Sequence, residues 1–208
     1  VAKAFPSVNH YALLGKLLKR GFPTYLVDLF ELWLRQATSR VKWRNIVSNE
    51  FCTRVGLNQG SVLAPAFFAL FIDELLVDTN RKQDVIAIGY ADDIIILTRS
   101  WSRLQVVFNI IERKLIALNL FLNVKKCVCL RIGPRFKKPC SPLVSVLGTS
   151  VDLVCEMRYL GVYLVAGRSF RVSISKAHNT FSKAVNGIFS KLLGHVDENA
   201  IVYLIKMQ

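Results

Sequence analysis

Two adjacent carboxylates, Asp92 and Asp93, lie between two strongly apolar segments, residues 85–88 and 94–97. These segments predict the arms of a β-hairpin over residues 84–98, and a tight turn would place both carboxylates at one end of it. A charge close to an apolar core is costly unless it is paired or bound to a metal. Carboxylate oxygens suit Mg²⁺, so the pair indicates a magnesium site. The alternative is a polar turn between two strands, which the short motif taken alone favours.

The chain as a whole is basic, with 28 Lys and Arg against 14 Asp and Glu and a formal charge of +14 over 208 residues. This surplus favours a polyanionic partner, either nucleic acid or an anionic membrane, although many basic proteins have neither. Residues 55–72 form the longest uncharged stretch near the middle, but Asn58, Gln59 and Pro65 make it a poor spanning segment. Apolar residues make up 52% of the chain, which predicts a globular protein.

The charges are distributed unevenly along the chain. Residues 113–151 contain no Asp or Glu, whereas six of the fourteen acids fall within residues 73–93. A basic channel beside an acidic metal site would have this distribution, and a solvated charged loop would contribute to it. The acid-free stretch carries the cations Lys114, Lys125, Lys126, Arg131, Arg135, Lys137 and Lys138.

Five cysteines are present: Cys52, Cys127, Cys129, Cys140 and Cys155. Their number is odd, no two of them form a CxxC pair, and the three histidines are far apart in the sequence. These features argue against a zinc site and against a disulfide framework. We therefore expect buried, reduced thiols.

Helices and strands follow one another in mixed order, which predicts an α+β fold. Helices are expected from a cap at Ser7 to a stop at Gly21, over residues 24–35 and 66–77, after a cap at Ser100, and from about residue 173. Besides the hairpin arms, strands are expected at residues 40–44 (with one basic face), 51–55, 120–122, 127–132 and 158–164.

Five short motifs occur in order along the chain, and Asp92-Asp93 belongs to the third. They are residues 1–10 (VAKAFPSVNH), 56–65 (GLNQGSVLAP), 90–93 (YADD), 120–127 (LFLNVKKC) and 159–162 (YLGV). In this order they resemble the motifs of reverse transcriptases from non-LTR (LINE-type) retrotransposons. The resemblance covers essentially the whole chain. Each motif is weak by itself, whereas five in the family's order are highly specific.

The resemblance implies a right-hand polymerase palm with an antiparallel sheet and helices, partial fingers and the start of a helical thumb. The palm with partial fingers would cover residues 1–165, and the truncated thumb residues 166–208. The implied activity is RNA-directed DNA polymerase, a deoxynucleotidyl transfer with two Mg²⁺ ions, for which Mn²⁺ is an alternative. The implied partners are an RNA template, a DNA primer and deoxynucleoside triphosphates, without a membrane. The implied location is intracellular, in the nucleus or a cytoplasmic ribonucleoprotein.

The resemblance also implies roles for individual residues. Asp92 and Asp93 would be catalytic and bind metal. Lys126 would protonate the leaving pyrophosphate, although its place in a basic stretch slightly favours simple neutralisation of phosphate. Phe5 would exclude a ribose 2′-hydroxyl, or it would be an ordinary core residue. The basic strand at residues 40–44 would contact the template, or it would be a solvated edge.

Other implied roles concern contacts with substrate and primer. Gln59, Gly60 and Tyr90 would form part of the nucleotide- and template-binding site, since glycine lets a backbone approach a ligand closely. The primer grip would consist of Tyr159, Leu160 and Gly161, for which a hairpin with a tight glycine is an equal alternative.

Two positions depart from the family pattern. The family's aspartate that supplies a third metal ligand falls just before Val1, and Pro6 stands where another aspartate is common. Proline cannot ligate a metal, although it suits an early helical position. Together with the patterned residues at both ends, these departures predict a fragment that is inactive as given. The alternative is a degenerate, non-catalytic nucleic-acid-binding remnant of such a polymerase.

Overall fold

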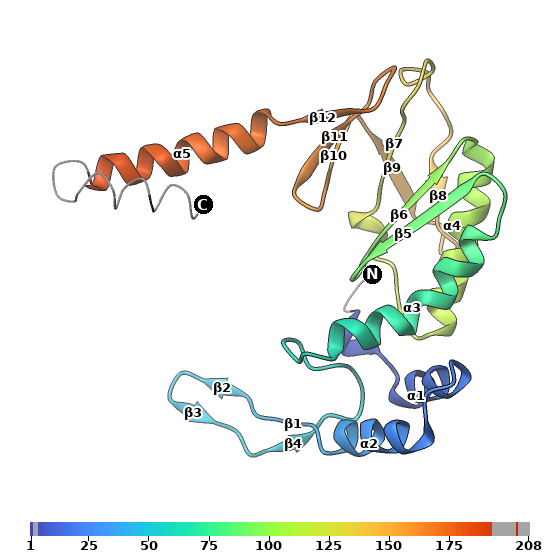
Figure 1. The fold of residues 1–208 in the computed structure, drawn as a ribbon. Coiled ribbons are helices and arrows are strands. Elements are labelled where there is room, and N and C mark those ends of the chain that lie inside the picture. Colours follow the sequence, from blue (N-terminus) through green and yellow to red (C-terminus); the bar gives the residue numbers. More distant parts are fainter. Residues whose placement is uncertain (2–3, 193–202, 204–208) are drawn as a thin grey trace. The chain divides into compact units, whose positions relative to one another are not determined.

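The computed structural model describes Val1, residues 4–192 and Tyr203 (Figure 1). Helices alternate with small, mostly antiparallel sheets, which confirms the α+β prediction. The chain divides into two compact units, which are described separately below. The first is Val1–Cys127 with Leu143–Ser150, and the second is Val128–Pro142 with Val151–Gln208. The division into palm, fingers and thumb stays a prediction.

The first helices of the chain follow the predicted pattern with one correction. Ser7 does not cap a helix but ends the 3₁₀ turn η1 (Phe5–Ser7), and α1 (His10–Lys19) begins after Asn9. The Asn9 side chain accepts a hydrogen bond from the Ala12 amide at 3.0 Å, as an N-cap does. The stop at Gly21 is confirmed, because this glycine has a φ of 77° and closes α1 in a Schellman motif.

The segment after α2 is more fragmented than predicted. α2 spans the expected residues (Thr24–Arg35), and four two-residue strands follow it: β1 (Thr38–Ser39) pairs with β4 (Phe51–Cys52), and β2 (Lys42–Trp43) with β3 (Ile46–Val47). One strand over residues 40–44 is therefore a wrong prediction. Arg44 has a φ of 53° and lies in the turn between β2 and β3, where such a conformation is favoured.

The predicted hairpin is confirmed. β5 (Val85–Tyr90) pairs with β6 (Asp93–Thr98), with Val85 opposite Thr98 and Tyr90 opposite Asp93. α3 (Ala64–Asn80) packs on β5 and α4 (Trp101–Ala117) packs on β6 (Figure 1). Val85 and Ala87 are buried while their neighbours in β5 are exposed, so one face of the hairpin belongs to the core.

The core of the first unit gathers around α3, where Phe68 and Phe71 are fully buried. Burying a side chain of this size contributes roughly 1.5–3 kcal/mol. One face of α4 and one face of α1 supply further core residues. These residues are Leu13, Leu17, Val107, Phe108, Ile111 and Leu115.

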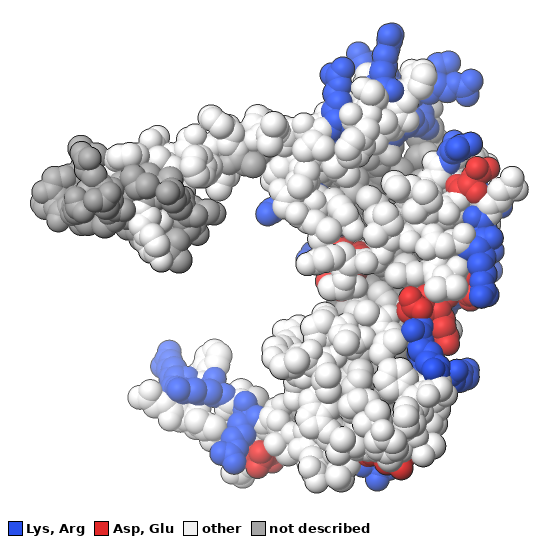
Figure 2. Space-filling view, in the orientation of Figure 1, with Lys and Arg blue, Asp and Glu red and all other residues white. Residues whose placement is uncertain are grey.

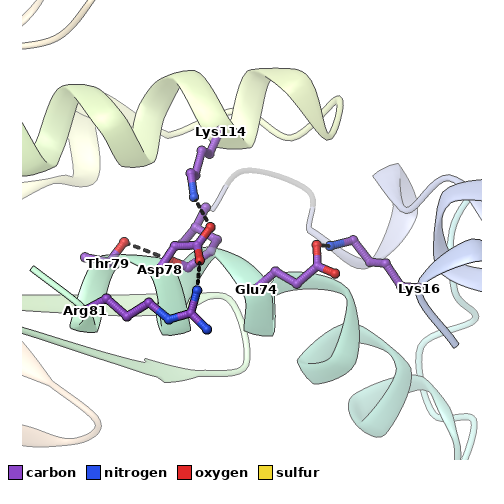
Figure 3. A network of polar contacts seen from close by, with 7 residues as sticks. Lys16, Glu74, Asp78, Thr79, Arg81 and Lys114 are labelled. Atoms are coloured by element: carbon purple, nitrogen blue, oxygen red, sulfur yellow. Dashed lines mark hydrogen bonds and ion pairs between the residues drawn. The ribbon is translucent and has the colours of Figure 1, made fainter. Parts of the chain in front are cut away.

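Ion pairs link α3 to the helices on either side of it, as Figure 3 shows. Lys16 of α1 reaches Glu74 with 2.5 Å between Nζ and Oε2, and Lys114 of α4 reaches Asp78 at 2.5 Å. The hydrogen bond from Lys16 lowers the pKa of Glu74, and the one from Lys114 lowers the pKa of Asp78. Only the Lys16 side chain is buried, so solvent screens both pairs in part.

These lowered pKa values predict a loss of stability in acid. Near the pKa of these carboxyls, the native chain binds fewer protons than the unfolded chain. The ion pairs therefore stabilise the fold fully above the ordinary carboxyl pKa, which is 4.5 for Glu74, and this stabilisation is lost as the pH falls. We expect the urea midpoint of unfolding to decrease as the pH is lowered from about 6 to about 3. In the Glu74→Gln variant this decrease should be smaller, because glutamine does not titrate. An unchanged pH dependence in Glu74→Gln would contradict this account.

The remaining part of the first unit contains β8 (Leu143–Val144) and η2 (Val124–Lys126). The strand predicted at residues 120–122 is wrong, because no named strand covers it in the described structure. Leu120 is instead fully buried in the core. The Asn119 conformation, with a φ of 58°, ends α4 just before it.

The second unit contains two small sheets and a helix. β7 (Val128–Leu130) pairs in parallel with β9 (Ser150–Val154), and β10 (Glu156–Tyr159), β11 (Val162–Val165) and β12 (Arg171–Ser173) form an antiparallel sheet. The single strand predicted at residues 158–164 is wrong, because Leu160 and Gly161 have φ values of 47° and 85° and turn the chain. The hairpin alternative is confirmed. α5 (Ser175–Leu192) bears out a helix near the end of the chain.

The thiols are less buried than expected. All five cysteines are free, but Cys52 and Cys155 are exposed and only Cys129 is buried. Burial raises the pKa of Cys129 to about 11 and also raises the pKa of Cys127. No helix in the described part of the chain is long and apolar enough to cross a membrane.

A difference in thiol reactivity follows from this burial. Thiolates rather than thiols react with maleimides, so in the folded chain at about pH 8 we expect Cys52 and Cys155 to be alkylated first and Cys129 last. Peptide mapping by mass spectrometry measures the order. Labelling of Cys129 as fast as Cys52 would show that the strand carrying Cys129 is not packed as described.

Candidate active site

The carboxylates of the third motif lie at the tip of the β5–β6 hairpin. Tyr90 pairs with Asp93, so Ala91 and Asp92 form the two-residue turn. Ala91 has a φ of 49°, a left-handed conformation that costs an L residue roughly 1–2 kcal/mol. Backbone strain of this kind is concentrated at functional sites. Asp92 and Asp93 are both exposed, and neither forms an ion pair with a residue that the structure describes.

The start of the first motif reaches this hairpin tip. The amino group of Val1 donates a hydrogen bond to the main-chain carbonyl of Asp92 at 2.6 Å. Cys127, the last residue of the fourth motif, is near enough for the Val1 charge to oppose the burial that raises its thiol pKa. The first motif is therefore hydrogen-bonded to the tip of the third, and the end of the fourth lies within electrostatic range of Val1.

Main-chain hydrogen bonds join the first motif to the second. The Leu57 amide donates to the Phe5 carbonyl at 2.8 Å, and the Gly56 amide donates to the Val8 carbonyl at 2.8 Å. The His10 ring closes the same contact, since its Nε2 donates to the Gly56 carbonyl at 2.7 Å. Two segments about fifty residues apart in sequence are thus held together through backbone atoms.

Phe5 contributes to packing. Its ring stacks on Phe68 of α3, with 4.9 Å between the centroids and 29° between the planes, and it is only partly buried. This contact supports the interpretation of Phe5 as a core residue. A partly exposed ring is also available to a ligand, so exclusion of a 2′-hydroxyl stays a prediction.

Gln59, Gly60, Tyr90 and Lys126 are exposed in the first unit. Gln59 and Gly60 belong to the turns before α3, and Gly60 has a φ of 89° with open space around it. Tyr90 is 64% exposed at the hairpin tip. Lys126 ends the η2 turn and forms no ion pair with any residue in the described part of the chain. All four residues are accessible to a substrate, and their roles stay predictions.

The residues of the predicted primer grip belong to the second unit. Tyr159, Leu160 and Gly161 form the end of β10 and its turn into β11. Two successive left-handed residues are typical of a tight hairpin turn. The Tyr159 hydroxyl is buried and has no hydrogen-bond partner among the described residues.

The donors for a divalent metal can be assessed from these residues. Asp92 and Asp93 offer hard, exposed and unpaired carboxylates, which fit Mg²⁺. Within the described residues there is no group of three or more His, Cys, Asp or Glu side chains that could hold a metal. The described residues at the tip therefore offer two carboxylates to a metal ion, and their role as ligands stays a prediction.

A cavity of about 370 Å³ lies at the opposite end of the hairpin and not at its tip. Asp84 and Arg99 line it, with 3.7 Å between their charged groups. None of the predicted site residues lines this cavity, so it does not contribute to the candidate active site.

One known protein family matches most of the chain. The family described as Reverse transcriptase (RNA-dependent DNA polymerase) matches residues 1–164. The chain belongs to the reverse transcriptase family. A similar protein is the RNA-directed DNA polymerase from mobile element jockey of Drosophila melanogaster, which is 28% identical over 89% of this chain and 21% of its own length.

A second relative of this reverse transcriptase chain is the Retrovirus-related Pol polyprotein from type-2 retrotransposable element R2DM, also of Drosophila melanogaster. It is 27% identical over 80% of this chain and 17% of its own length. The chain thus spans about a fifth of the relatives that it matches. The resemblance to non-LTR retrotransposon reverse transcriptases is confirmed.

Some residues that organise this reverse transcriptase chain were not predicted. Glu112 is only 2% exposed, and its carboxylate accepts a hydrogen bond from the Val146 amide at 2.7 Å. Its position could have been found, since a charged residue four places after Phe108 and three before Leu115 falls on the apolar stripe. His10 and Val1 carry no such signal, because their partners are main-chain carbonyls distant in sequence.

Proposed function

We propose that this chain forms the palm of an RNA-directed DNA polymerase from a non-LTR retrotransposon. The polymerase would add deoxynucleotides to a DNA primer on an RNA template. The observation that carries the proposal is the convergence at the hairpin tip, where two exposed carboxylates meet the start of the first motif. The family match supports the reaction class.

Asp92 and Asp93 would hold divalent metal, with Mg²⁺ as the first choice and Mn²⁺ as the second. Bound metal would supply activation of the attacking hydroxyl and neutralisation of charge on the leaving group. The family's third carboxylate precedes Val1 in the pattern. Since the Val1 amino group lies 2.6 Å from the Asp92 carbonyl, a residue at that position would neighbour the same tip.

Other exposed residues of the first unit would contact the substrates. Lys126 would place a cation beside the phosphates, where it neutralises charge or protonates the leaving pyrophosphate. The exposed turn with Gln59 and Gly60 would receive the nucleotide and the template, and Phe5 would limit the space beside the sugar. Tyr90 would complete this pocket, and Tyr159, Leu160 and Gly161 would grip the primer.

A second candidate function is a non-catalytic remnant that binds nucleic acid through charge alone. The observation that favours it is Pro6, an exposed residue of the η1 turn at a position where the family commonly has aspartate. The formal charge of +14 would sustain such binding without chemistry.

Primer extension distinguishes the two functions. The chain is extended at its N-terminus by the segment that precedes the first motif in its relatives, including the aspartate. It is then assayed with poly(rA), an oligo(dT) primer, dTTP and Mg²⁺. Incorporation of deoxynucleotide supports the polymerase. Binding of the primed template without incorporation, in Mg²⁺ and in Mn²⁺, supports the remnant and rejects the proposal.

A further inference from the structure

A loop of the second unit, directly after β7, carries several cations. Residues 131–138 contain Arg131, Arg135, Lys137 and Lys138 but no acid. The Arg131 guanidinium donates hydrogen bonds to the carbonyls of Arg135 at 3.2 Å and Lys138 at 2.8 Å. The loop is therefore folded around Arg131, and the side chains of Arg135, Lys137 and Lys138 are exposed.

A second basic segment lies against this loop. The Gly133 amide donates to the Gly167 carbonyl at 2.8 Å, and Ile132 forms a β-bridge with Gly167. This contact places Arg168 and Arg171, both exposed, next to the loop although they are at least thirty residues away in sequence. The buried Gly167 is the joint between the two segments.

The two segments carry no acids of their own. Residues 131–142 and 166–175 contain no Asp or Glu, and the five exposed cations form no ion pair with a residue that the structure describes. In Figure 2, Lys and Arg side chains gather at the top of the view, where Figure 1 draws these two loops. Like charges within a Debye length of about 8–10 Å repel one another. A bound polyanion would neutralise these cations and so stabilise their arrangement.

We propose that Arg135, Lys137, Lys138, Arg168 and Arg171 form a phosphate-binding patch for the sugar–phosphate backbone of nucleic acid. We call these five residues the basic patch. The choice of nucleic acid over other polyanions rests on the proposed function. Contacts of this kind are independent of sequence, because they are made to phosphate and not to base edges.

The patch is separate from the predicted primer grip. β11 follows the turn at Leu160 and Gly161 and ends at Val165, two residues before Gly167, so the two sites lie at opposite ends of the β10–β11 hairpin. The six steps along the chain from Gly161 to Gly167 would span roughly 20 Å at the rise of an extended strand. At 3.4 Å per base pair, this separation corresponds to about six base pairs of duplex. The patch would thus add contacts to nucleic acid beyond those at the primer end.

The test compares two triple variants that lose the same charge. The patch variant is Arg135→Gln, Lys137→Gln and Lys138→Gln. The control is Arg35→Gln, Arg81→Gln and Arg99→Gln, three exposed arginines of the first unit that pair with acids. Binding of a labelled single-stranded RNA and of an RNA–DNA hybrid is measured by fluorescence anisotropy over a series of KCl concentrations.

We expect the slope of log K against log[KCl] to become shallower by about 2 in the patch variant, with roughly tenfold weaker binding in low salt. The control should keep the wild-type slope. A loss limited to the hybrid would assign the patch to duplex, and a loss on both ligands would assign it to the backbone of either. Equal slopes for the patch variant and the control would overturn the proposal.

Two further measurements keep the outcome decisive. If circular dichroism shows that the triple variant does not fold, the pair Arg168→Gln and Arg171→Gln from the second segment is tested by the same criterion. Sedimentation with phosphatidylserine vesicles tests the other polyanionic surface, and loss of vesicle binding with an unchanged RNA slope would overturn the proposal. Because binding is the readout, a chain that uses the patch but extends no primer contradicts only the proposed function.

Discussion

Asp92→Asn is expected to reduce the rate of primer extension by about 10³-fold in the chain that carries the family's preceding segment. Asparagine keeps the shape of the side chain but removes the charge, and charge neutralisation at a metal site contributes several kcal/mol to the transition state. Each 1.36 kcal/mol corresponds to a factor of ten in rate. Asp93→Asn should show a loss of similar size, because its carboxylate is equally exposed at the same tip.

The measurement is steady-state incorporation of dTTP on primed poly(rA), with binding of the same primed template followed separately. Binding should change by less than about twofold, since one charge in a basic chain contributes little to backbone affinity. Asp28→Asn is the matched control, because Asp28 is an exposed carboxylate of α2 outside every motif. Retention of extension in Asp92→Asn, or an equal loss in Asp28→Asn, would remove Asp92 from the active site.

Much of the fold follows from local patterns in the sequence. The boundaries of α2 and the arms of the β5–β6 hairpin agree with periodicity, because helical spacing and continuous apolar runs report local burial. The turn at Asp92 also follows, since adjacent carboxylates between apolar arms have no favourable place in the core. The position of the paired carboxylates at the hairpin tip was therefore predictable.

Features that depend on distant partners were not predictable in the same way. The prediction of one strand over residues 40–44 is wrong because the alternation there fits a strand, whereas Arg44 turns the chain. The strand over residues 158–164 was misjudged for the same reason at Leu160. Short turns in which a residue other than glycine adopts a left-handed conformation do not change the hydrophobic pattern, so they are difficult to predict from the sequence.

The contacts that assemble the candidate site are mainly between backbone atoms. Val1 binds the Asp92 carbonyl, and Leu57 binds the Phe5 carbonyl. Every non-proline residue offers the same backbone N–H donor and C=O acceptor, so the residue type does not predict such a contact. The order of the motifs indicated that they belong together, and the structure adds which atoms join them. The joint between the first and second motifs can be tested at its one glycine.

Gly56→Ala is expected to destabilise the first unit by about 2–5 kcal/mol. Gly56 has a φ of 91°, which costs an L side chain roughly 1–2 kcal/mol. An added Cβ would also lie 2.6 Å from the Pro6 carbonyl oxygen and 2.7 Å from its Cα, and overpacking of this kind costs roughly 1–3 kcal/mol. The backbone cannot move away freely, because the Gly56 amide is bonded to the Val8 carbonyl and the His10 ring to the Gly56 carbonyl.

Two other glycines separate the conformational cost from the steric cost. Gly21 has a φ of 77° with no atom near an added Cβ, so Gly21→Ala should lose about 1 kcal/mol from conformation alone. Gly15 lies inside α1 with open space beside it, so Gly15→Ala should raise the free energy of unfolding by about 0.5–1 kcal/mol. Urea unfolding of the three variants measures the series. If Gly56→Ala costs no more than Gly21→Ala, the first and second motifs are not packed through Pro6. If Gly56→Ala costs more than Gly21→Ala, the close contact of Gly56 with Pro6 fixes the start of the exposed turn at Gln59 and Gly60. Both ends of that turn are then held by buried residues.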